Sequence, residues 1–87
     1  MYIHVKGHAA NRWREYVGPS AVREIARTVR RHLMAALKSG ISIDSTGVGH
    51  IQIKPNLWAV VVPEIGRWVV ITFHQGTNYA ERIKMQT

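Results

Sequence analysis

The chain has no cysteine, only five acidic residues and no long apolar run. Without cysteine it forms no disulfide, and no thiolate is present to act as a nucleophile or a metal ligand. The longest apolar run, residues 57–62, is far shorter than the roughly 20 residues that a membrane helix needs. No apolar segment follows a basic start, as a secretion signal requires. We therefore expect a cytoplasmic protein that does not bind membranes.

Common enzyme motifs are also missing. The sequence contains no phosphate-binding P-loop, no dinucleotide-binding glycine pattern and no HExxH or GxSxG motif. The acidic residues are far apart in sequence, which disfavours a two-metal nuclease because that chemistry needs clustered carboxylates. The histidines show no close metal-ligand spacing. We expect neither a cofactor nor a metal.

Basic residues are abundant, with twelve Lys and Arg against five Asp and Glu. The excess is concentrated in residues 1–40, which hold eight basic and two acidic residues, whereas residues 41–87 hold four and three. Such a field favours a polyanion, with RNA preferred over DNA, or an acidic partner protein. The alternative is a solvated basic surface without a partner.

The apolar pattern predicts one α+β domain spanning residues 1–87. Residues 8–16 and a second segment from Pro19 or Ser20 to Gly40 have helical spacing, and Arg23, Arg27 and Arg30 fall on the outer face of the second. Residues 2–6, 48–54, 57–62 and 67–73 are predicted strands. Residues 76–87 fit a strand, a helical turn or a tail.

The predicted order is therefore β-α-α-β-β-β, with two helices packed on one face of a mainly antiparallel sheet. Trp58 and Trp68 are expected in neighbouring strands, where they would pair across the hairpin in the core. Base stacking on an exposed sheet face is the alternative. The core of so short a chain is thin, and a homodimer would add stability.

Three residues are candidates for catalysis. RNA is cut without a metal when its own 2′-OH attacks, so a protein needs only a base, an acid and cations. His8 and Arg12 are neighbours on one helix face, and His74 ends the last strand, with Thr72 on the same side. Backbone bonding by His8, a salt bridge from Arg12 to a glutamate and a plain surface position for His74 are the alternatives.

The candidates for nucleic-acid binding are basic side chains suited to phosphate contacts: Arg14, Arg23, Arg27, Arg30, Arg31 and Lys54. Among the other histidines, His32 is expected to face solvent, and His4 and His50 are expected at sheet-surface positions.

The pattern His8-Ala9-x-x-Arg12-x-Arg14-Glu15, a long helix ending at Gly40 and the final run Trp68 to Phe73 resemble the RelE-like toxin superfamily. That group of small bacterial and phage proteins also holds barnase-like and EndoU-like ribonucleases. The resemblance implies two helices against a curved sheet and metal-independent RNA cleavage, with His8, Arg12 and Thr72 or His74 in the matching places. The chain differs from the RelE type itself by having Gln52 and Lys54 in place of an arginine-rich central strand.

Three hypotheses follow. The first is a metal-independent endoribonuclease of toxin type, with an acidic antitoxin as its partner. The second is a non-catalytic nucleic-acid-binding module. The third is a phage or plasmid accessory protein that binds an acidic host protein or forms a homo-oligomer.

Overall fold

The computed structural model describes residues 2–40, 43 and 45–76, so residues 77–87 lie outside the described part. The predicted order of elements is confirmed. The elements are β1 (Tyr2–Val5), α1 (Gly7–Tyr16), α2 (Val22–Ser39), β2 (Gly49–Lys54), β3 (Leu57–Glu64) and β4 (Arg67–Gln75). No helix in the described ranges is long and apolar enough to cross a membrane.

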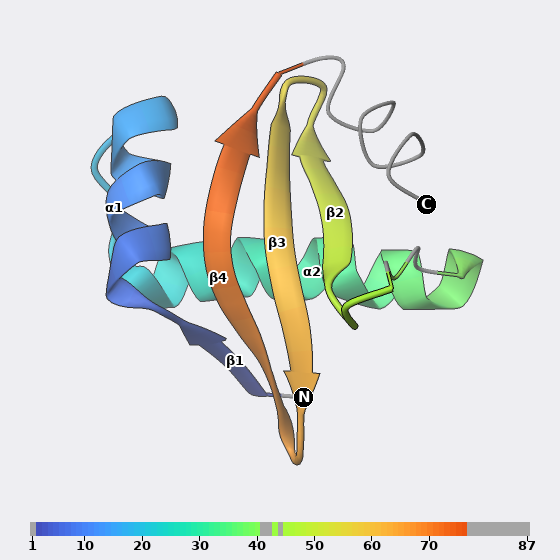
Figure 1. The fold of residues 1–87 in the computed structure, drawn as a ribbon. Helices are drawn as coiled ribbons and strands as arrows, with labels where there is room; N and C mark the ends of the chain where they lie inside the picture. Colours follow the sequence, from blue (N-terminus) through green and yellow to red (C-terminus); the bar gives the residue numbers. More distant parts are fainter. Residues whose placement is uncertain (1, 41–42, 44, 77–87) are drawn as a thin grey trace.

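The four strands form one mixed sheet in the order β1-β4-β3-β2 (Figure 1). The two hairpin pairs, β2 with β3 and β3 with β4, are antiparallel. The strand β1 runs parallel to β4 and pairs only with its first half, from Arg67 to Val70. A parallel partner is expected here, because the chain leaves β1 through two helices before it returns to the sheet. The predicted α+β fold with a mainly antiparallel sheet is confirmed.

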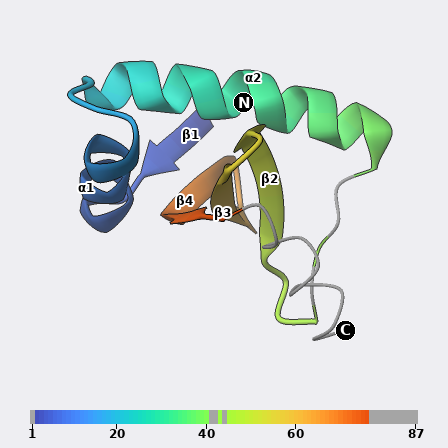
Figure 2. The same cartoon turned by 90° about the horizontal axis from the view of Figure 1, so that it is seen from above.

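Both helices contribute to a single core (Figure 2). The helix α2 crosses one face of the sheet, and its Ile25, Val29 and Leu33 are fully buried. The helix α1 packs against β4, where the rings of Trp13 and Phe73 meet edge to face, with centroids 5.2 Å apart. The other buried members of the core are Ile3, Val5, Ala9, Ala10, Ile51, Ile53, Leu57, Ala59, Val61 and Val70.

The start of α2 differs from the prediction. The helix begins at Val22, with Ala21 as its N-cap and no side-chain cap. The hydroxyl of Ser20 instead accepts a hydrogen bond of 3.0 Å from Trp13 Nε1. The indole N–H of a buried tryptophan needs an acceptor, and this bond ties α1 to the loop before α2. The predicted end of α2 at Ser39 and Gly40 is confirmed.

The predicted pairing of Trp58 with Trp68 is wrong. The β3–β4 turn lies at Ile65 and Gly66, so the register places Trp58 opposite His74 and Trp68 opposite Pro63. Trp68 is half-buried against the core. Trp58 lies on the other face of the sheet, because its chain neighbours Leu57 and Ala59 point into the core. In the apolar run of β3, the side chains that face the core are therefore buried, whereas Trp58 on the other face is only half-buried.

Candidate active site on the open sheet face

The sheet face opposite α2, which we call the open face, is covered by no helix among the described residues (Figures 1 and 2). Phe73 points into the core, so its neighbours Thr72 and His74 point to the open face. His50 and Gln52 lie there too, because Ile51 between them is a core residue. The open face therefore displays side chains from β4, β3 and β2.

The register arranges these side chains in two rows. One row runs Thr72, Val60, His50 and the next runs His74, Trp58, Gln52, each across β4, β3 and β2. Adjacent strands lie about 4.8 Å apart, so the side chains within each row are near neighbours. His50 and His74 belong to different rows and lie diagonally across β3.

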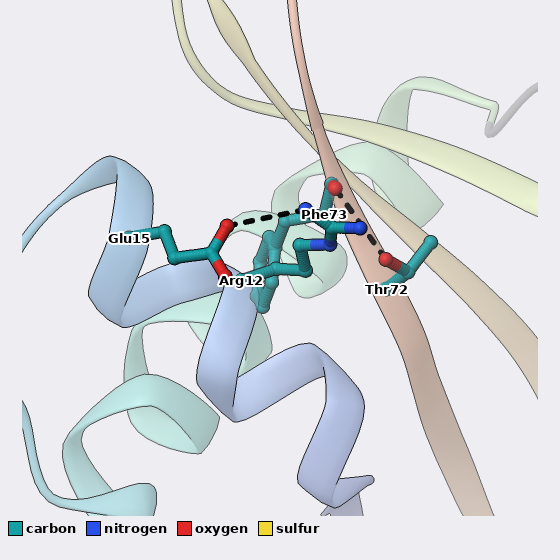
Figure 3. Close-up of polar contacts among 4 residues, drawn as sticks. All are labelled: Arg12, Glu15, Thr72 and Phe73. Carbon is teal, nitrogen blue, oxygen red and sulfur yellow. Dashed lines mark hydrogen bonds and ion pairs between the residues drawn. The ribbon is translucent and has the colours of Figure 1, made fainter.

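The helix α1 adds two more groups at the edge of this face. The first half of β4 pairs with β1, and α1 packs beside the rest of β4 (Figure 1). Arg12 points from α1 toward β4, the strand that carries Thr72 and Phe73 (Figure 3). Its Nη1 also forms an ion pair of 3.1 Å with Glu15. A salt bridge to a glutamate is the alternative to a catalytic role for Arg12 that the sequence suggests. His8 is exposed one turn earlier on the same flank.

Charged groups from α1 and β2 act on His74. Burial, and then the charges of His50, Arg12 and His8, lower the pKa of His74 below its usual 6.5. Each of these causes disfavours the protonated ring. The lowered pKa favours a neutral imidazole for His74 at neutral pH, and three basic or titratable side chains lie near enough to act on it. We call His8, Arg12, His50 and His74 the His74 cluster.

The remaining basic candidates lie elsewhere. Arg14 falls on the opposite flank of α1 and donates to the backbone carbonyl of Ser20 and to Asn11 Oδ1, at 3.4 and 3.5 Å. Lys54 is exposed at the end of β2, and its charge is not among those that act on His74. The predicted nucleic-acid-binding set is thus not continuous with the His74 cluster.

The arginines of α2 form a second basic surface. Arg23, Arg27, Arg30 and Arg31 are all exposed, on the side of α2 that points away from the sheet. We call them the α2 arginine row. The ion pairs Arg12–Glu15 and Arg67–Glu64 do not involve this row. The sheet separates the α2 arginine row from the His74 cluster. The basic residues of positions 1–40 therefore belong to two separate surfaces.

His50 is the site residue that sequence reasoning missed. It was expected only at a sheet-surface position, which is correct but incomplete. The alternation of β2 reveals which face His50 occupies, whereas its nearness to His74 depends on the register of two hairpins. His32 differs from the expectation of a solvent-facing side chain, because it is half-buried and its Nδ1–H donates to the carbonyl of Thr28 at 2.9 Å.

No group of three or more His, Asp or Glu side chains in the described part of the chain is arranged to hold a metal ion. No known protein family matches the chain, and no curated protein matches it. The geometry of the open face is therefore the basis for a functional assignment.

The lowered pKa of His74 leads to a first prediction. In an NMR titration of the histidine ring protons, His74 is expected to titrate with a midpoint below 6.5. The His50→Ala variant should raise this midpoint, because it removes the largest of the charges that oppose protonation. The Lys38→Ala variant, an exposed change on α2, should leave it unchanged. A midpoint at or above 6.5 in the wild type would contradict the arrangement.

Proposed function

We propose that the chain is a metal-independent endoribonuclease of toxin type whose active site is the His74 cluster. The observation that carries the proposal is the placement of His50 and His74 on one face of the sheet, with Arg12 and His8 of α1 near enough for their charges to act on His74. The resemblance of the His8 to Glu15 segment to the RelE-like superfamily supports the same chemistry. Such an enzyme would act on cytoplasmic RNA, and an acidic antitoxin would suit its basic surface.

The cluster contains the parts that the reaction needs. The neutral ring of His74 accepts the proton of a ribose 2′-OH as the 2′-oxygen attacks the adjacent phosphorus. The bond from phosphorus to the 5′-oxygen breaks, and His8 donates a proton to that leaving oxygen. Arg12 stabilises the negative charge on the non-bridging oxygens. The products are a 2′,3′-cyclic phosphate and a free 5′-OH.

RNA cleavage in the presence of EDTA tests this proposal. The wild type should cut unstructured RNA and leave cyclic phosphate ends, and His8→Ala should cut much more slowly because the leaving group lacks its acid. Asn11→Ala, which changes an exposed residue on another flank of α1, is the matched control and should retain activity. Absence of cleavage of every RNA tried would refute the enzyme. Equal rates for His8→Ala and Asn11→Ala would refute the role of His8.

A second candidate function, nucleic-acid binding without catalysis, is favoured by the α2 arginine row. Four exposed guanidinium groups on one helix suit phosphate contacts better than lysines would. The row does not depend on the histidines, so it would bind nucleic acid even in an inactive relative. The groove beside it is lined by Tyr2, Ile3, Val22 and Ala26 together with Arg23, Arg27 and Arg30, and it would also suit an acidic host protein.

Salt dependence separates this function from catalysis. If the row tracks phosphates, binding of RNA should weaken steeply with salt, and Arg27→Ala should reduce the slope of log K against log salt by about 0.7–0.9. The Glu24→Gln variant, on the same helix, should leave the slope unchanged or slightly steeper. Filter binding or anisotropy at several salt concentrations measures this. Binding that is insensitive to salt would contradict the assignment. In a pull-down, loss of a partner protein after nuclease treatment would show that RNA bridged the contact.

A further inference from the structure

The open face carries both charged groups and an apolar strip. The phosphate-handling groups proposed above come from α1, β4 and, through His50, from β2. The apolar strip belongs to β3, where Trp58 lies directly between His74 and Gln52 in one row of the sheet. Val60, two residues along β3 on the same face, is only 7% exposed. Trp58 thus sits in an apolar surface next to the proposed catalytic base.

A nucleotide has the same division, because its phosphate is charged and its base is flat and weakly polar. Bases of single-stranded nucleic acids stack on exposed aromatic rings, and this stacking tolerates any sequence because every base has a π-face. Trp58 is half-buried, so its ring loses little side-chain freedom on binding. A phosphate held by Arg12 and His74 would leave the adjoining base over β3.

Gln52 provides a polar group at the far edge of this surface. Its Nε2 donates a hydrogen bond of 3.3 Å to the backbone carbonyl of Pro55. A carbonyl only accepts, so this contact fixes which end of the amide is Nε2. The amide oxygen of Gln52 is then left as an acceptor for an N–H group on the edge of a base. Gln52 is exposed, so the contact costs little desolvation.

We propose that Trp58 is a stacking platform for an unpaired base next to the scissile phosphate, with Gln52 at the edge of that base. The substrate class is therefore single-stranded RNA. In a duplex the bases are stacked on one another, and their edges are paired, so neither contact forms. This inference rests on the proposed function for its choice of RNA, but the platform itself is tested by binding.

The test uses short RNA with 2′-O-methyl groups, which resists cleavage, so binding is measured on the intact chain. Trp58→Phe, which keeps a flat ring, should bind nearly as well as the wild type. Trp58→Leu, which keeps apolar volume but no ring, should bind about 5- to 150-fold more weakly, the range expected for loss of one stacked base. Gln52→Leu should weaken binding by a smaller factor. A duplex of the same sequence should show no difference between Trp58→Phe and Trp58→Leu.

Crosslinking gives a second measurement that needs no substitution. Photoactivation of 5-iodouridine in the bound single strand should link it to the peptide that contains Trp58. Equal affinity of Trp58→Leu and Trp58→Phe, or crosslinks confined to α2, would overturn the platform. Absence of RNA cleavage together with a Trp58-dependent affinity would refute the enzyme but retain the platform. Cleavage that is unaffected by Trp58→Leu would refute the platform but retain the enzyme.

Discussion

Replacing His74 with alanine is expected to reduce the rate of RNA cleavage by about 10²- to 10⁴-fold, the usual contribution of a positioned proton acceptor. His74 is the residue on which the other charges of the cluster act, and the register places it opposite Trp58. Single-turnover cleavage of a defined RNA in EDTA measures the loss. His4→Ala is the matched control, because His4 is half-buried in β1 and pairs with Val69, in the other half of β4.

The pH dependence of the reaction gives an independent check on this role. A base acts in its neutral form, so the rate falls as pH drops through its pKa. Since the pKa of His74 is lowered, the acidic limb of the wild-type profile should lie below pH 6.5. His50→Ala raises that pKa and should move the limb toward higher pH. A His74→Ala enzyme as active as His4→Ala would remove His74 from the mechanism.

The sequence predicts the order of elements well because each is encoded locally. Alternation over residues 2–6 and 48–54 and the helical stripe from Val22 to Leu37 are both short-range patterns. The differences from the predicted elements also have physical causes. Ser20 has the chemistry of a helix cap, yet its hydroxyl is the acceptor for Trp13, and a sequence gives no sign of such a tertiary contact.

The candidate site was predictable only in part. Local spacing identifies His8 and Arg12 as neighbours on one helix, and strand alternation places Thr72 and His74 on one side of β4. The contribution of His50 depends on the β2–β3–β4 register, and the separation of the α2 arginine row depends on which side of the sheet α2 covers. Both are properties of packing between segments far apart in sequence, so periodicity alone does not determine them.

The fold that holds this site depends strongly on Phe73, and Phe73→Ala is expected to destabilise the domain by about 3–5 kcal/mol. The ring is 1% exposed, and its removal leaves a cavity and ends the edge-to-face contact with Trp13 at 5.2 Å. For a domain of this size each kcal/mol lowers the melting temperature by about 4–8 °C, so thermal unfolding followed by circular dichroism should shift by about 12 °C or more.

Ile65→Ala is the control for that change. Ile65 lies fully exposed at the β3–β4 turn, so its truncation should alter the free energy of unfolding by no more than about 0.5 kcal/mol. Phe73→Leu, which keeps most of the apolar volume, should fall between the two. Because Phe73 anchors β4 between Thr72 and His74 and packs on the helix that carries His8 and Arg12, Phe73→Leu should also slow cleavage while the protein remains folded. A Phe73→Ala melting temperature equal to that of Ile65→Ala would show that β4 and α1 are not held together by this contact.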